Sequence, residues 1–351
     1  MRGFRRWVLA AAAALGLGVA GAQAGGAEPL RRPVHRHPLT FRMPPAPSEA
    51  IAGLVGEYGT EQGLLEVFER AGVLWADGRG LQSEHLTPRG GDRWGSSAGD
   101  LVFERDRSGG GAAVTFRGER IVRVDLGAEA EARIRAAVRA DPVRLRASAL
   151  AATPPSEPPP KQRSDLVALA SLDPTIKLDI RYATANNFMG VVLYERPAAF
   201  LQRPAAEAVA RVSRSLKPLG YGLMVHDAYR PWFVTKMFWD ATPAEFHVFV
   251  ANPANGSRHN RGGAVDLTLY DLSTGRAVEM PGRYDEFSHR SFPDYIGGTS
   301  RQRALRDLLR REMEKQGFTV YPQEWWHFDY RTWRDYGIGN TTFTELVRTG
   351  H

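Results

Sequence analysis

In the first half of the chain, hydrophobic residues recur in short runs that are separated by turn signals. Val114 and Phe116 flank the polar Thr115, which is the alternation of a half-buried strand. Strands are predicted in this way at Leu64–Phe68, Val73–Ala76, Leu101–Phe103, Ala113–Phe116 and Ile121–Val124. Glycine-rich turns such as 108–111 lie between them. The pattern predicts a small antiparallel β domain, and a helix at Glu129–Arg139 follows it.

In the second half, apolar residues recur at helical spacing and a strand pattern follows each helix. One stripe runs over Ala205–Leu216 and stops at Pro218, after which Tyr221–Val225 reads as a strand. A second stripe runs over Leu305–Met313, and Phe318–Tyr321 follows as a strand. We therefore predict an α+β fold, with a central antiparallel sheet flanked by helices in the C-terminal domain and the small antiparallel β domain before it.

Two proline-rich segments suggest where the domains begin and end. Residues 151–163 contain Pro154-Pro155 and Pro158-Pro159-Pro160, which are incompatible with a helix interior or a central strand. Residues 25–50 are rich in proline and arginine. We predict linkers at 25–50 and 151–163, a β domain with a trailing helix at 51–150, and a second domain at 164–351.

The charge balance indicates export rather than nucleic-acid binding. The chain of 351 residues has a net charge of +7, but Arg2, Arg5 and Arg6 precede a short apolar run that ends at Ala22-Gln23-Ala24. This is the pattern of a signal peptide at 1–24, and its removal lowers the net charge to +4. The run is short for a membrane span, so we expect a periplasmic or extracellular protein with no stable membrane anchor. Without a basic stripe interleaved with aromatic residues, we expect no nucleic-acid partner.

The chain contains no cysteine, which narrows the possible chemistry. Disulfide scaffolds, cysteine nucleophiles and zinc fingers are excluded. Any metal site must therefore be built from histidine and carboxylate ligands.

The segment 257–266 carries the first candidate chemistry. His259 and Asp266 lie seven positions apart, and Gly262 and Gly263 allow a tight turn that brings both side chains to one point. Asp266 begins an apolar strand and points to the face opposite its apolar neighbours, so it needs a partner. A zinc ion is one such partner, and a hydrogen-bonded His–Asp pair in a loop is the alternative.

The run Glu324-Trp325-Trp326-His327 is the second candidate. The two tryptophans place the acid beside a possible ligand where access of water is limited. Catalytic zinc usually takes three protein ligands, and His259, Asp266 and His327 complete that number. Glu324 is then a candidate general base. The alternative is a core aromatic cluster with two polar residues at its edge.

Arg230 is the third candidate. It follows the predicted strand Tyr221–Val225 and precedes Pro231, which places a fixed positive charge at a sheet edge. Hydrolysis of an amide needs such a charge to stabilise the developing oxyanion. A surface salt bridge with Asp227 is the alternative.

Together these segments resemble the zinc-dependent D-alanyl-D-alanine dipeptidases of the vancomycin-resistance type, peptidase family M15. The resemblance covers about residues 164–330 and includes the run 180–188, Tyr-Arg-Pro at 229–231, the S-x-H-x-R-G-x-A-x-D pattern and Glu-Trp-Trp-His. It implies one Zn²⁺ per chain.

The resemblance also implies a role for each matching residue. The zinc ligands are His259, Asp266 and His327, the catalytic base is Glu324, and the oxyanion is stabilised by Arg230. Three positions are implied to bind substrate, of which Asp285 receives the free amino group and the others are Tyr182 and Ser257.

The chain departs from this family in two respects. His226 stands where related proteins have an aromatic residue, and we expect it to pack beside the site rather than bind metal. The signal peptide and the β domain are not found in cytoplasmic relatives, which argues against a role in depleting a cytoplasmic pool of D-alanyl-D-alanine.

We therefore expect an exported enzyme that hydrolyses D-alanyl-D-alanine or related short D-amino-acid peptides through a metal-activated water, with Glu324 as general base. One alternative is a peptidoglycan D,D-carboxypeptidase or endopeptidase whose β domain contacts the cell wall. Another is a wall-binding protein without activity, which would have no need for a base beside an open zinc position.

Overall fold

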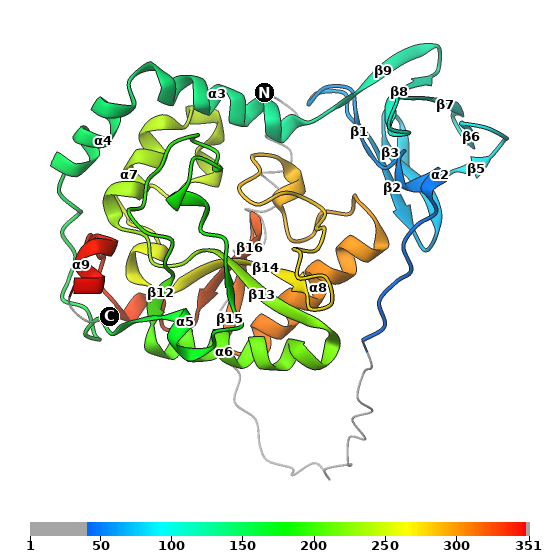
Figure 1. Cartoon of the computed structure of the whole chain (residues 1–351). Coiled ribbons are helices and arrows are strands. Elements are labelled where there is room, and N and C mark those ends of the chain that lie inside the picture. Colours follow the sequence, from blue (N-terminus) through cyan, green and yellow to red (C-terminus); the bar gives the residue numbers. More distant parts are fainter. Residues whose placement is uncertain (1–40, 349–351) are drawn as a thin grey trace, which may run out of the picture.

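Short antiparallel strands form the N-terminal sheet, which is the upper right part of Figure 1. The computed structural model describes residues 41–348. The strand order is β4-β3-β2-β1-β9-β8-β7-β6-β5. The strands are β1 (Gly56–Tyr58), β2 (Leu65–Arg70), β3 (Val73–Gly78), β4 (Leu81–His85), β5 (Thr87–Pro88), β6 (Arg93–Ser96), β7 (Gly99–Arg105), β8 (Gly111–Phe116) and β9 (Glu119–Val124). A short helix, α2 (Glu49–Ala52), precedes them.

The five strands predicted in this half are confirmed, each with small changes at its ends. They carry the apolar residues of the sheet's core, including Leu65, Leu74, Leu101, Val114 and Ile121. The remaining four strands are short or carry few apolar residues, so their sequences lack a clear alternation.

Two helices connect this sheet to the rest of the chain. Asp125 accepts a hydrogen bond from the backbone N–H of Ala128 and thereby caps α3 (Leu126–Ala140), which α4 (Pro142–Ala151) follows. Although α3 follows the β strands, its buried residues Ile134 and Val138 belong to the C-terminal core.

The C-terminal sheet has the order β11-β13-β14-β16-β15. Its strands are β11 (Lys177–Leu178), β13 (Tyr221–Asp227), β14 (Ala264–Asp271), β15 (Phe318–Tyr321) and β16 (Glu324–Tyr330). All pairs are antiparallel except β11 with β13, which is parallel. The predicted central antiparallel sheet is therefore confirmed, and the short β11 adds one parallel pair at its edge. Between β11 and β13 the chain makes a long crossover that includes a helix, as parallel pairing requires.

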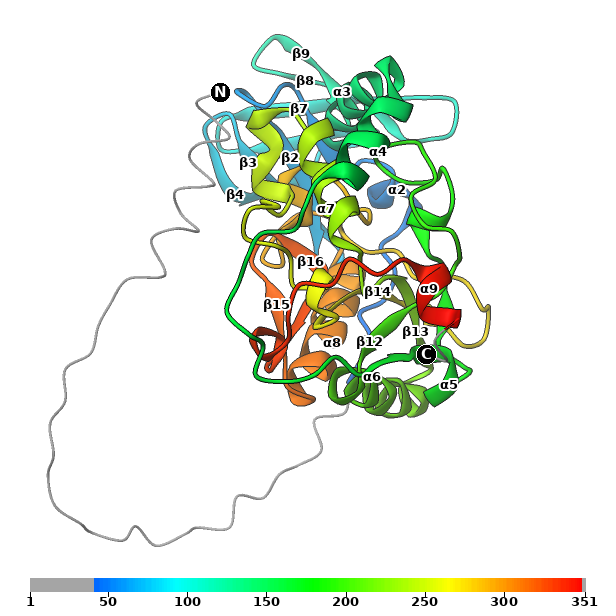
Figure 2. The ribbon, with the colours of Figure 1, turned by 90° about the vertical axis from the view of Figure 1, so that its left-hand side faces the viewer.

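Helices cover both faces of this sheet. On one face α6 (Arg203–Leu216) contacts β13, and α8 (Ser300–Lys315) contacts β14, β15 and β16. On the other side α7 (Trp232–Ala241) packs against α3 and α4, as both views show (Figures 1 and 2). Smaller elements complete this part of the chain: β10 (Leu166–Ala168), which pairs with β12 (Phe200–Gln202), α5 (Leu169–Leu172) and α9 (Phe343–Arg348).

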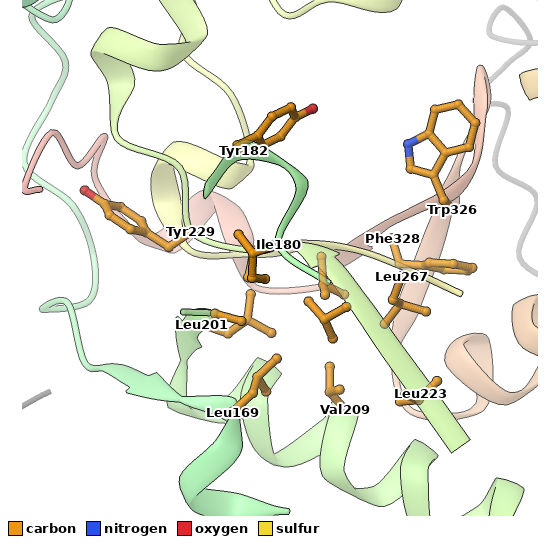
Figure 3. Close-up of a cluster of buried hydrophobic side chains, with 14 of the residues drawn as sticks. Leu169, Ile180, Tyr182, Leu201, Val209, Leu223, Tyr229, Leu267, Trp326 and Phe328 are labelled. Carbon is orange, nitrogen blue, oxygen red and sulfur yellow. The ribbon is translucent and has the colours of Figure 1, made fainter. Parts of the chain in front are cut away.

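The hydrophobic core lies under one face of the sheet and determines which strand side chains point towards that face. Leu267 of β14 and Phe328 of β16 lie next to each other above Val209 of α6 (Figure 3). Because side chains alternate along a strand, Asp266 and His327 point to the opposite face, where they are directly paired across the two strands.

The proline-rich segment is attached to the C-terminal part. Residues 152–165 contain neither helix nor strand in the structure. Glu157 within it accepts hydrogen bonds from the Arg261 side chain at 2.7 Å and from the Ile338 backbone N–H at 2.6 Å. The assignment of this segment as a boundary between two domains stays a prediction.

The predicted signal peptide and residues 25–40 of the first predicted linker lie outside the described residues. Between residues 41 and 348, no helix combines the length and apolar character that a membrane span requires.

Core packing under the sheet predicts a clear stability difference between two leucines near β14. Leu267→Ala should lower the free energy of unfolding by about 2–5 kcal/mol, because Leu267 is fully buried and its removal leaves a cavity. Leu272→Ala, at a leucine that is 42 % exposed, should change it by less than about 0.5 kcal/mol. Urea unfolding measures both, and equal losses would contradict the described core.

Candidate active site

A tight turn and a strand pairing bring three predicted ligands to one point. β14 and β16 place Asp266 directly opposite His327. The short 3₁₀ helix His259–Arg261 ends at Gly262, which has a left-handed φ of 63° that favours glycine. At Gly263 the backbone passes so close to Trp333 that a β-carbon would lie 2.4 Å from that residue. The turn returns the chain so that His259 faces Asp266.

The three side chains are buried and share one centre. His259 Nε2 lies 3.0 Å from His327 Nδ1, and Asp266 Oδ1 lies 3.3 Å and 3.1 Å from these two nitrogens. His259 is 2 % exposed, His327 6 % and Asp266 2 %. Their ligand atoms lie within 4.8 Å of one another.

The outer hydrogen bonds of the two histidines determine what this centre can hold. His259 Nδ1 lies 2.6 Å from the carbonyl oxygen of Ala228, and His327 Nε2 lies 2.9 Å from Asp329 Oδ1. Each outer nitrogen must carry the proton to donate there, so the facing nitrogens of the neutral rings carry lone pairs. Within residues 41–348, Asp266 Oδ1 has no hydrogen-bond donor other than these two histidine rings. Two lone pairs and a carboxylate oxygen fit a metal ion, and this donor set suits Zn²⁺.

Asp329 is a functional residue that the sequence analysis missed. It orients His327 and also lies 3.3 Å from Arg258 Nε. Burial by itself lowers the pKa of His327, but the charges of Asp329 and Asp266 outweigh it and raise that pKa to about 10. The site therefore favours a positive charge between its carboxylates. The signal in the sequence was an acid two positions after His327, on the same face of the strand.

Glu324 stands at the beginning of β16, beside the ligand group. Its Oε2 lies 3.5 Å from His327 Nδ1. Burial raises the pKa of Glu324 to about 7, with the nearby charge of Asp266 acting in the same direction and His327 opposing it. A carboxyl group with a pKa near neutrality can both accept and return a proton, as a general base must.

Arg230 is buried and held in one orientation. Its Nε and Nη2 lie 2.9 Å and 2.8 Å from Asp227 Oδ2, and Asp227 Oδ1 accepts a hydrogen bond from Tyr194 at 2.7 Å. The guanidinium lies over the Phe238 ring at 4.6 Å from its centroid. A surface salt bridge is therefore wrong as a description, because Asp227 is 1 % exposed. Arg230 Nη2 is 3.7 Å from Asp266 Oδ2, next to the ligand group.

The three residues predicted to bind substrate line the same small cavity of about 60 Å³ as the ligand group. The Tyr182 hydroxyl donates to the Asp285 carboxylate at 2.8 Å, and Ser257 Oγ accepts from the backbone N–H of His259 at 3.0 Å. Burial, together with the charge of Asp266, raises the pKa of Asp285 well above its usual range. Among the described residues no cation forms an ion pair with Asp285, so the charged form of this carboxyl lacks a partner that a cationic group of a ligand would supply.

Comparison with known proteins agrees with this geometry. Residues 162–336, which include every site residue described above, match the family model of the D-Ala-D-Ala dipeptidases in peptidase family M15. The D-alanyl-D-alanine dipeptidase of Escherichia coli strain K12 is 31 % identical over 187 residues, which are 53 % of this chain and 95 % of that protein. The chain belongs to this family.

Two further D-alanyl-D-alanine dipeptidases are similarly related to this chain. Those of Enterococcus faecium and Enterococcus faecalis are 33 % and 32 % identical over 174 and 171 residues. Each match covers 44 % of this chain, and 86 % and 85 % of the relatives. The chain is therefore a peptidase of the D-Ala-D-Ala dipeptidase family with an N-terminal part, residues 41–161, that lies outside the family match.

His226 packs beside this family's site and is not a ligand in the described centre. Its ring stacks on Tyr284 with centroids 4.5 Å apart, and its Nδ1 lies 3.4 Å from Asp179 Oδ2. The Tyr284 hydroxyl in turn donates to Asp266 Oδ2 at 3.2 Å. Tyr284, which the sequence analysis did not single out, therefore holds the second oxygen of a ligand carboxylate.

The hydrogen bond from His327 to Asp329 predicts a measurable effect on metal binding. Asp329→Asn should weaken zinc affinity by about 10- to 100-fold, because a neutral amide oxygen is a weaker acceptor than the carboxylate and holds the ring and tautomer of His327 less firmly. Competition with a chromophoric chelator measures this affinity. Asp335→Asn, at an acid that pairs with Lys161, is the matched control and should leave the affinity unchanged. Equal affinities of the two variants would contradict the role of Asp329.

Proposed function

We propose that this protein is an exported zinc dipeptidase that hydrolyses D-alanyl-D-alanine or a closely related D-amino-acid dipeptide. The observation that carries the proposal is that Asp285 and the group His259, Asp266 and His327 line one small cavity. A carboxylate available for an ammonium group, this close to a peptidase metal centre, selects a substrate whose free amino group is near the scissile bond. The names of the relatives support D-alanyl-D-alanine as that substrate.

The residues of the cavity have different roles in the proposed reaction. A bound zinc ion supplies Lewis-acid activation of water and of the peptide carbonyl. Glu324 accepts the proton of the attacking water and returns it to the leaving amine. Arg230, fixed by Asp227, supplies positive charge for the developing oxyanion. Tyr182 holds the Asp285 carboxylate towards the substrate amino group.

Aromatic side chains close the cavity around these charges. Its wall includes Phe188, Phe238, Phe249, Phe287 and Trp326. Trp326 is buried, and Figure 3 shows its indole and the Tyr182 ring above the aliphatic core. Such a wall excludes bulk water, which strengthens the interaction of Arg230 and Asp285 with a bound dipeptide.

Export is a separate part of the proposal and rests on residues 1–24. A periplasmic or extracellular enzyme would meet short peptides released from peptidoglycan rather than the cytoplasmic pool of D-alanyl-D-alanine.

The role of Glu324 predicts a loss of turnover without loss of metal. Glu324→Gln should lower kcat by about 10²- to 10⁴-fold, because the amide cannot take the proton of water. Zinc content, measured by atomic absorption, should stay at one ion per chain. Glu314→Gln, on the exposed side of α8, is the control and should keep full turnover. A Glu324→Gln enzyme as active as the parent would rule out this mechanism.

The role of Asp285 predicts selectivity for a free amino group. The parent enzyme should hydrolyse D-alanyl-D-alanine and leave its N-acetylated form intact. Asp285→Asn should raise KM for the dipeptide by about 10- to 100-fold, the value of a charge-assisted hydrogen bond. Steady-state assays with the free and the N-acetylated dipeptide measure both effects. Efficient cleavage of the acetylated form, or of wall muropeptides, would favour a D,D-carboxypeptidase or endopeptidase instead.

A further inference from the structure

The loop that carries Asp285 lies against the N-terminal part of the chain. We call residues 281–299, which precede α8, the Asp285 loop. In Figure 1 it is the yellow-orange segment beside β1 and the beginning of α3. The N-terminal part lies outside the family match, so its contacts with the loop are an addition to the matched region.

The Asp285 loop depends on its surroundings for its conformation. Asp285 has a φ of 58°, a left-handed value that is unfavourable for a residue with a β-carbon. Glu286 is buried and organises the turn, since its carboxylate accepts hydrogen bonds from the Arg283 backbone N–H and the Ser288 hydroxyl, both at 2.7 Å. The position of Glu286 therefore controls the position of Asp285.

The first turn of α3 packs directly on Glu286. A β-carbon at Gly127 would lie 2.4 Å from Glu286 Cγ, so only glycine permits this approach. Asp125, the N-cap of the same helix, pairs with the Arg283 guanidinium through two contacts at 2.5 Å and 3.0 Å. The beginning of α3 thus contacts Arg283 and Glu286, which lie on either side of Asp285 in the sequence.

β1 and β2 hold the far end of the loop. Glu57, which is 2 % exposed, lies 2.9 Å from His289 Nε2. Burial by itself lowers the pKa of His289, but Glu57 outweighs it and raises that pKa, which favours an ion pair. The backbone N–H of Glu69 donates to the Gly298 carbonyl at 3.0 Å, and its carboxylate accepts from the Ser300 N–H at 2.6 Å.

We propose that the N-terminal part acts as a clamp on the Asp285 loop, and that Asp125, Gly127 and Glu57 are positioning residues for substrate binding. They touch neither the metal ligands nor Glu324 in the described contacts, so they act through Asp285. The inference rests on the proposed function, because it assigns Asp285 the substrate amino group. The N-terminal part is then required for specificity, whatever else it binds.

Kinetics of two clamp variants test the proposal in the full chain. Gly127→Ala inserts a methyl group against Glu286, and Asp125→Asn removes the charge that faces Arg283. Each should raise KM for D-alanyl-D-alanine by about threefold to tenfold, with kcat within about twofold and zinc content unchanged. Asp100→Asn, which removes the charge of an exposed pair with Arg93 in the N-terminal sheet, is the control and should behave as the parent. Unchanged KM in both clamp variants would overturn the proposal.

A double-variant comparison separates positioning from general destabilisation. If the clamp acts through Asp285, Gly127→Ala should raise KM in the parent but cause no further rise in an Asp285→Asn background. Equal rises in the two backgrounds would overturn the proposal.

Hydrogen exchange supplies a readout that needs no activity. Amides of the Asp285 loop should exchange at least about tenfold faster in Gly127→Ala, while amides of β14 and β16 keep their protection. If the parent fails to hydrolyse D-alanyl-D-alanine but the loop exchanges faster, the proposed function fails and the clamp stands. Unchanged exchange in the loop would overturn the clamp itself.

Discussion

Two imidazole nitrogens and one carboxylate oxygen meet in a buried centre, and the rest of the site depends on what they need there. His259 Nε2 and His327 Nδ1 lie 3.0 Å apart, and their outer nitrogens donate to Ala228 and Asp329. Two facing lone pairs repel unless a proton or a metal cation lies between them. The β14–β16 register, the left-handed turn at Gly262 and the β13 end that presents the Ala228 carbonyl all serve to build this arrangement.

The charged groups around the centre differ in their surroundings, and these differences set the charge state and partners of each group. Arg230 is held by Asp227 and lies 3.7 Å from Asp266 Oδ2, so Asp266 Oδ1 faces the two histidines. Glu324 Oε2 lies 3.5 Å from His327 Nδ1, but burial outweighs the charge of that histidine and raises the pKa of Glu324 to about 7. Asp285 is bound only by Tyr182 among the described side chains, so its charged form has no cationic partner there. One cavity therefore brings together the three candidate metal ligands, Glu324, Arg230 and Asp285.

The sequence predicts those parts of the fold and the site whose pattern lies within one short segment. The strand Phe318–Tyr321 and the candidate chemistry of Glu324–His327 were both predicted, because each pattern lies within a few consecutive residues. α7 was not predicted, because Trp232–Ala241 is apolar almost all around and shows no amphipathic stripe. The burial of Asp227 and the contact of Tyr284 with Asp266 depend on segments far apart in sequence, which spacing alone cannot reveal. The packing of Gly127 on Glu286 is hidden for the same reason.

Anomalous diffraction from crystals of the zinc-loaded protein shows whether the facing histidines and Asp266 hold the ion. We expect one strong peak at the zinc edge, at about 2.0–2.2 Å from His259 Nε2, His327 Nδ1 and an Asp266 oxygen. A peak elsewhere, or a crystal grown in excess zinc in which the two histidines stay within hydrogen-bond distance without a peak between them, would contradict it.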